Sequence, residues 1–184
     1  MNPHPSPTEV IVDLYLAGCV ELFANYGLSE RLQRVGSDPG RTQVTTYVSA
    51  LGATGPGLAF SSSVTIGAYL LGDLHPAPAG TSLTEADLQD WCRELNNQLV
   101  GRVKNKLLRH GCEVNAGLPV LMTGNGVDVL GSPGQDSRRY HFATEQGCLT
   151  LTLAMVVAPG LSLRGLVAVP LDEDVAPEGM HALF

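Results

Sequence analysis

The sequence predicts an α+β fold, in which an antiparallel sheet carries long helices packed on one face. Residues 7–26 and 84–110 have the hydrophobic spacing of long helices, and much of the remaining chain consists of short β-type runs separated by turns. The short connections between these runs favour antiparallel pairing. The chain has 184 residues, 44% of them hydrophobic. This size predicts one domain over residues 1–184 with an ordinary core, although two half-size units would also fit the length.

The first helix is expected over residues 7–26. Proline is accepted in a first turn, so Pro7 fits the start, and either Ser6 or Thr8 can cap it. Gly27 can end the helix.

Two strands and a short helix are expected next. A β-branched run at residues 43–51 is typical of a strand, and the break GATGPG separates it from a second strand around 58–63. Residues 64–71 are predicted to form a short helix that Gly72 ends. The serines at 61–63 are expected to cap that helix.

The second long helix has the clearest sequence signals. Thr84 and Asp87 have the spacing of a capping box, with acidic residues near the positive end of the helix dipole. The helix is expected to run to about Arg109 or His110 and to stop at Gly111. The apolar side that should pack on the core consists of Trp91, Leu95, Leu99, Val103 and Leu107.

The rest of the chain is predicted to be β. Strands are expected at residues 112–114, 118–122, 139–144 and 148–156, the last two joined by a hairpin. Alternation marks a core-facing side of the last strand, formed by Leu149, Leu151, Leu153 and Met155. Within residues 158–184, the run 163–171 offers a further strand, and the acidic end that follows is expected to be mobile.

The outer face of the second long helix combines unusual residues. Asp90, Glu94, Asn97, Gly101 and Lys104 recur at helical spacing and fall within an arc of roughly 80°. Glycine inside a helix costs about 1 kcal/mol relative to alanine, which suggests that another molecule approaches closely here. The Asn97 amide can orient water but is not a strong base, and neither it nor Glu94 is a nucleophile. These residues suit attack by water on an electrophile that is activated elsewhere.

This face resembles the signature of the CheC, CheX and FliY family of chemotaxis phosphatases. The pattern D-x3-E-x2-N that starts at Asp90 is followed, after 21 intervening residues, by Pro119, which is one residue earlier than is usual in the family. Gly101 and Lys104 extend the match towards the CheX branch. The order of expected elements also fits over about residues 7–157. The first helix lacks the second motif of the CheC branch, which favours one site per chain.

The resemblance implies a phosphatase that acts on an aspartyl-phosphorylated, CheY-like response regulator. Asn97 would position the water, and Glu94 would pair with a lysine of the regulator. Gly101 would allow close approach, while Asp90 and Lys104 would assist docking or hold the face in shape. No cofactor of the protein's own is implied, because the Mg²⁺ belongs to the regulator.

Two alternatives remain for this face. The first is a non-catalytic module of the same fold that binds a regulator or a larger assembly. In the second, the match to the family pattern is accidental and the face has no function. Glu94 and Lys104 are then ordinary solvated charges, and one of the adjacent residues Asn96 and Asn97 has no specific role.

The resemblance also implies a homodimer formed through sheet edges. Residues 149–156 and 163–171 offer long β segments, and an open edge of that kind is a liability unless it is paired. If residues 163–171 instead fold back over the edge, the chain is a monomer.

Composition argues against several other functions. A net charge of −7 disfavours nucleic-acid binding, and no apolar run approaches the roughly 20 residues of a membrane span. The N-terminal sequence lacks a signal-peptide pattern, so a cytoplasmic protein is expected. The four cysteines form no C-x-x-C pair and the histidines no i, i+4 pair, so no metal site is expected.

Overall fold

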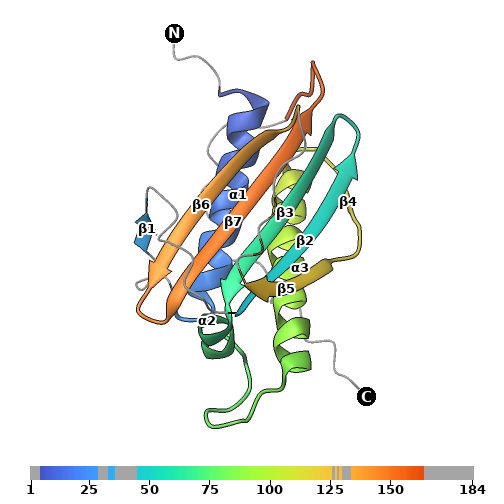
Figure 1. Ribbon diagram of the computed structural model, residues 1–184. Helices are drawn as coiled ribbons and strands as arrows, with labels where there is room; N and C mark the ends of the chain where they lie inside the picture. Colours follow the sequence, from blue (N-terminus) through green and yellow to red (C-terminus); the bar gives the residue numbers. More distant parts are fainter. Residues whose placement is uncertain are drawn as a thin grey trace.

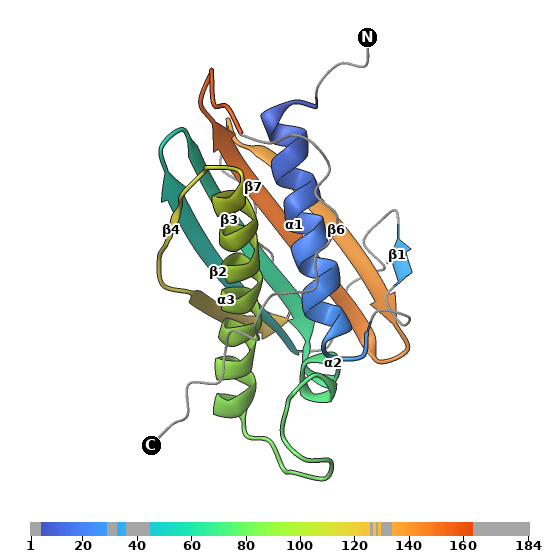
Figure 2. The same cartoon turned by 180° about the vertical axis from the view of Figure 1, so that it is seen from behind.

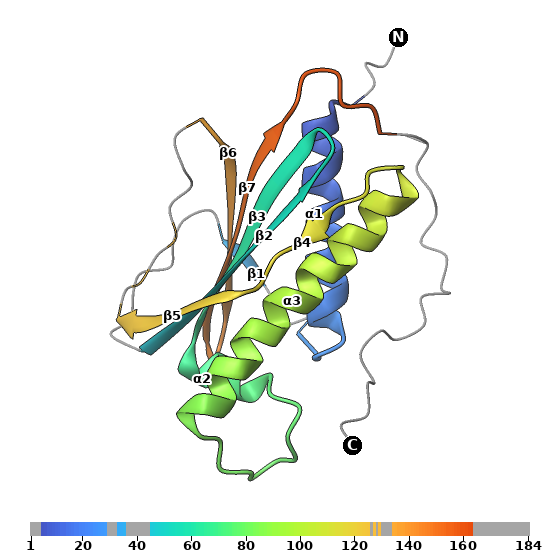
Figure 3. The ribbon, with the colours of Figure 1, turned by 90° about the vertical axis from the view of Figure 1, so that its right-hand side faces the viewer.

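Two long helices lie side by side on one face of an antiparallel sheet (Figures 1 and 2). The structure is a computed structural model, which describes residues 5–28, 33–35, 45–125, 127, 129 and 134–163. Its helices are α1 (Pro7–Ala24), α2 (Ala68–Asp73) and α3 (Glu85–Arg109). Its strands are β1 (Gln33–Val35), β2 (Thr45–Gly55), β3 (Leu58–Gly67), β4 (Asn115–Ala116), β5 (Val120–Asn125), β6 (Asp136–Thr144) and β7 (Gly147–Val157). The predicted α+β fold is confirmed, and Figure 3 shows its two layers from the side.

The strands of the described part pair in the order β1-β6-β7-β3-β2-β4, and β5 also pairs with β2. Every pair is antiparallel. The β2–β3 hairpin closes at the pair Gly55 and Leu58, where Gly57 has a φ of +79° that favours glycine. The predicted β6–β7 hairpin is present and closes at Thr144 and Gly147. The central strands β2, β3 and β7 contact the helix layer.

The core lies between the sheet and the two long helices. The predicted alternation in β7 is confirmed, because Leu149, Leu151, Leu153 and Met155 are each at most 1% exposed. The predicted apolar side of α3 is buried as well. Gly18 of α1 faces α3 at the contact between the two helices, where an added Cβ would lie in van der Waals contact with Val103 Cγ2 at 3.4 Å. An ion pair of 2.5 Å between Glu21 and Lys106 joins the same two helices.

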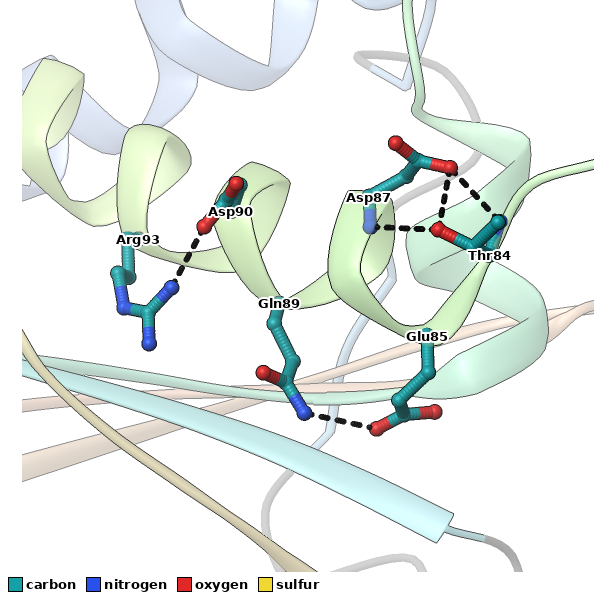
Figure 4. A network of polar contacts seen from close by, with 6 residues as sticks. All are labelled: Thr84, Glu85, Asp87, Gln89, Asp90 and Arg93. Atoms are coloured by element: carbon teal, nitrogen blue, oxygen red, sulfur yellow. Dashed lines mark hydrogen bonds and ion pairs between the residues drawn. The ribbon is translucent and has the colours of Figure 1, made fainter.

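Both long helices begin with a capping box, and Figure 4 shows the one at the start of α3. The Thr84 N–H donates to Asp87 Oδ2 at 2.8 Å, and the Asp87 N–H donates back to Thr84 Oγ1 at 3.2 Å. The Thr84 hydroxyl and N–H hold the pKa of Asp87 below its usual value. The Tyr47 hydroxyl donates to Glu85 at 2.5 Å, so α3 is also tied to β2 at its first residue. Burial, with this hydrogen bond, raises the pKa of Tyr47 to about 12.

Three local predictions are wrong. Residues 64–67 continue strand β3 instead of starting a helix, because they pair with β2 on one side and, up to Ile66, with β7 on the other. The serines at 61–63 also belong to β3 and do not cap α2, whose N-cap residue is Gly67. Residues 112–114 form no strand, and pairing with β2 starts at Asn115.

The predicted open edge at residues 149–156 is also wrong. Strand β7 is internal, because it pairs with β3 on one side and with β6 on the other. Leu163 is 5% exposed and lies outside any strand. The rest of the run 163–171, and the chain end predicted to be mobile, lie outside the described residues.

Candidate functional site

The five residues selected from the sequence all lie along α3 and are accessible. Asp90, Glu94 and Asn97 are exposed, and Gly101 and Lys104 are partly exposed. A Cβ built on Gly101 would meet no atom within 4 Å, so the surface beside it is open. The helix places a carboxylate, an amide and a side-chain-free position on one accessible stretch.

The adjacent asparagines of α3 have opposite environments. Asn96 is 0% exposed, whereas Asn97 is exposed and its amide has no hydrogen-bond partner among the described residues. The Asn96 Nδ2 donates to the Ser49 carbonyl at 2.9 Å and to the Ser62 carbonyl at 3.1 Å. The Ser62 hydroxyl donates to Asn96 Oδ1 at 2.8 Å. Asn96 is therefore a structural residue, and Asn97 is the asparagine available to another molecule.

The Asn96 contacts fix how α3 is rotated about its axis. Ser49 is in β2 and Ser62 in β3, so one side chain ties the helix to two central strands. Tyr15 of α1 joins this cluster, because its hydroxyl lies 3.1 Å from Ser62 Oγ. Buried polar groups cost free energy unless they are paired, so this cluster allows few alternative rotations of α3. With Asn96 directed into the core, Asn97 is directed outwards.

Glu94 and Asp90 each have a partner on the same helix. The Gln98 Nε2 donates to Glu94 Oε1 at 2.9 Å. Asp90 forms an ion pair of 2.6 Å with Arg93, and this pair is visible in Figure 4. The Asp90 side chain is 80% exposed, so the pair adds about 0.5 kcal/mol or less to stability. It leaves Asp90 accessible to a partner.

A shallow hollow beside Glu94 is lined by acidic and aromatic side chains: His75, Asp87, Asp90, Trp91 and Glu94. The Trp91 ring meets Tyr26 and His75 edge-on, at centroid distances of 5.3 Å and 5.6 Å. Three carboxylates on this rim favour a cationic group over an anionic one. The hollow extends the accessible face towards the start of α3.

Metal and thiol chemistry find no support in the described residues, where no group of three or more His, Cys, Asp or Glu side chains could hold a metal ion. Cys19, Cys92 and Cys112 are buried and Cys148 is half-buried, and none of the four forms a disulfide. Burial raises the pKa of Cys92 to about 12 and also raises that of Cys112. A high thiol pKa disfavours the reactive thiolate, in line with a packing role.

Among the described residues, no helix is long and apolar enough to cross a membrane.

Comparison with known proteins identifies the fold. No protein-family model and no curated protein matches the sequence. A chemotaxis protein CheX from Vibrio vulnificus superposes with a TM-score of 0.67, at 16% identity, over 85% of this chain and 100% of that one. The fold is that of CheX. A CheX from Desulfovibrio desulfuricans gives a TM-score of 0.62, at 17% identity, over 79% of this chain and 99% of its own.

A third match is a complex of CheX with CheY, BeF3 and Mg²⁺ from Borrelia burgdorferi. Its TM-score is 0.60, at 10% identity, over 78% of this chain and 96% of that one. The resemblance predicted from α3 is thus confirmed as a CheX fold that spans most of the chain. At these identities the likeness establishes the fold, and the roles of individual residues rest on the geometry of the site.

Three contributors to the site were missed in the sequence. Ser62 was expected to cap a helix, yet it anchors Asn96. Gln98 stands four residues after Glu94, a spacing that places two side chains together on a helix and could have indicated the contact. Tyr26, the partner of Gln98, comes from the chain after α1 and gave no such signal.

Proposed function

We propose that this protein is a CheX-like phosphatase of an aspartyl-phosphorylated, CheY-like response regulator. The observation that carries the proposal is the pair Glu94 and Asn97, exposed on a rigid helix whose neighbouring asparagine is buried. The CheX fold supports it, since one CheX of that fold occurs in a complex with CheY, BeF3 and Mg²⁺. The role implies that the protein works in the cytoplasm.

The reaction is hydrolysis of an acyl phosphate. Water attacks phosphorus, the bond between phosphorus and the aspartyl oxygen breaks, and inorganic phosphate and a free carboxylate result. An amide holds a water molecule through its carbonyl oxygen or its N–H groups without becoming charged, so Asn97 suits in-line placement of the nucleophile. The regulator supplies the Mg²⁺ that neutralises charge on the phosphoryl group, and this chain needs none of its own.

The other residues bind the partner. Glu94 pairs with the lysine of the regulator near the phosphoryl group, in a region that is already acidic because Asp90 and Asp87 line the same hollow. Gly101 lets the regulator backbone approach α3, which agrees with the open space beside it. Lys104 and Asp90 lie at the two ends of this surface and assist docking.

Loss of phosphate from a phosphorylated CheY-like regulator, measured with and without this protein, tests the activity. We expect faster release of inorganic phosphate in a single turnover with the protein present. Regulator affinity is measured in parallel with the BeF3 and Mg²⁺ form of the regulator. Binding without acceleration would identify the chain as a non-catalytic module of the same fold and contradict the enzyme assignment.

We also propose a homodimer, formed through β5 and not through β7. In the described part of the chain, β5 pairs only with β2, so its other edge is open. Leu118, Val120 and Met122 alternate along this segment and are 88%, 61% and 37% exposed. An open edge with an apolar row is a surface that proteins ordinarily cover, and a second copy across a two-fold axis would cover it.

A further inference from the structure

Two successive hydrogen bonds connect Glu94 to a residue outside its own helix. Gln98 donates from Nε2 to Glu94 Oε1 at 2.9 Å, and the Tyr26 hydroxyl donates to Gln98 Oε1 at 2.9 Å. Tyr26 and Gln98 are half-buried, whereas Glu94 is exposed. A glutamate on an open helix face ordinarily samples several rotamers. Here its carboxylate is tied, through Gln98, to the segment that follows α1.

The chemistry of the three groups permits one arrangement. An ionised carboxylate only accepts hydrogen bonds, so Gln98 must present its Nε2 to Glu94. The Gln98 Oε1 then faces Tyr26, whose hydroxyl must donate. Within the described part of the chain, Glu94 Oε2 has no hydrogen-bond partner, so one carboxylate oxygen is held and the other remains available to a cation.

Tyr26 is itself well anchored. Its ring meets Trp91 edge-on, with centroids 5.3 Å apart and an interplanar angle of 82°. Trp91 is 7% exposed and belongs to the buried side of α3, and His75 packs on it as well. Edge-to-face contacts of this kind favour one ring orientation. The Tyr26 hydroxyl, which donates to Gln98, therefore has a fixed position relative to α3.

We propose that Gln98 and Tyr26 are positioning residues that hold Glu94 in the orientation in which it binds the lysine of the regulator. The inference rests on the proposed function. Fixing a flexible side chain before association removes part of the entropy lost on binding. Immobilising one such side chain before binding lowers a dissociation constant by about 2- to 10-fold. We assign a gain in regulator affinity of this size to Gln98 and Tyr26 together.

The first test uses the free protein and no partner. The side-chain amide NMR signal of Gln98 reports both hydrogen bonds of that side chain. Glu94→Ala should shift this signal because it removes the acceptor, and Tyr26→Phe should shift it because it removes the donor while keeping the ring. Asn97→Ala is the matched control, since Asn97 is exposed and outside the chain of hydrogen bonds, and it should leave the signal in place. If the chemical shift of the Gln98 side-chain amide stays the same in both Glu94→Ala and Tyr26→Phe, the inference is overturned. The proposed function is unaffected by that result.

The second test measures affinity for a CheY-like regulator in its BeF3 and Mg²⁺ form. Gln98→Met keeps the length of the side chain and removes its hydrogen bonds, and we expect about 2- to 10-fold weaker binding. In a Glu94→Ala background, Gln98→Met should not weaken regulator binding any further. The reason is that the two substitutions remove the same interaction. Tyr26→Phe should follow the same pattern with a smaller loss.

The outcomes separate the two claims. If Glu94→Ala weakens binding but Gln98→Met does not, or if their effects multiply, the positioning role is wrong and the docking role of Glu94 stands. If Glu94→Ala leaves affinity unchanged, the docking role fails and the positioning role fails with it. Equal melting temperatures of the wild type and Gln98→Met exclude loss of the fold as the cause.

Discussion

The buried Asn96 and the exposed Asn97 provide a stability test of the account with two nearly identical substitutions. Asn96→Ala removes three hydrogen bonds of 2.8 to 3.1 Å to Ser49 and Ser62. Each contributes about 1 kcal/mol net, and the better helix propensity of alanine offsets roughly 0.5 kcal/mol. We therefore expect Asn96→Ala to lower the free energy of unfolding by roughly 2 to 3 kcal/mol. In a protein of this length that corresponds to a fall in melting temperature of about 4 to 12 °C.

Asn97→Ala should behave in the opposite way. Its amide has no partner among the described residues, so only helix propensity changes, and stability should stay the same or rise by about 0.5 kcal/mol. Thermal unfolding followed by circular dichroism, with urea unfolding as a check on two-state behaviour, measures both variants. Equal melting temperatures for Asn96→Ala and the wild type, or equal losses in the two variants, would refute the assigned rotation of α3.

Three further predictions concern the partner surfaces. Glu94→Ala should weaken regulator binding and activity together, and Glu94→Lys should weaken them more, with both effects larger at low salt; unchanged affinity in both variants would remove Glu94 from the docking surface. Gly101→Leu should leave the isolated protein at least as stable in thermal unfolding, because the space beside it is open, yet it should reduce regulator affinity; normal binding would make the glycine incidental. Sedimentation at micromolar concentration should give about twice the chain mass of 19.4 kDa and fall towards that mass in Val120→Lys; a single species near 19 kDa for the wild type would rule out the dimer.

Helical periodicity was the most informative signal in the sequence. It placed α3 from its cap at Thr84 to its end at Arg109, and it separated a buried side from an accessible one. The same periodicity also distinguishes the buried Asn96 from the exposed Asn97. Asn96 stands four residues after Cys92 and four before Val100, both of which are buried, so its position on the inner side follows from spacing alone. A polar residue at such a position needs partners, and these were not evident from the sequence.

Features that depend on long-range pairing were not accessible from the sequence. Residues 64–67 are β-branched or small and suit either a strand or a short helix, and pairing with β2 and β7 decides in favour of β3. The internal place of β7 is likewise a property of the sheet order, which short-range patterns do not specify. For the same reason, the contact of Tyr26 with Gln98 depends on how the segment after α1 packs beside α3.

The most direct test of the central claim is single-turnover dephosphorylation of a CheY-like regulator by the wild type and by Asn97→Ala. We predict that the wild type accelerates phosphate release and that Asn97→Ala, folded and bound to the BeF3 and Mg²⁺ form of the regulator with nearly wild-type affinity, does not. This outcome follows if the amide positions the attacking water and takes little part in docking. Full activity of the purified Asn97→Ala protein would contradict the assignment of α3 as the catalytic face.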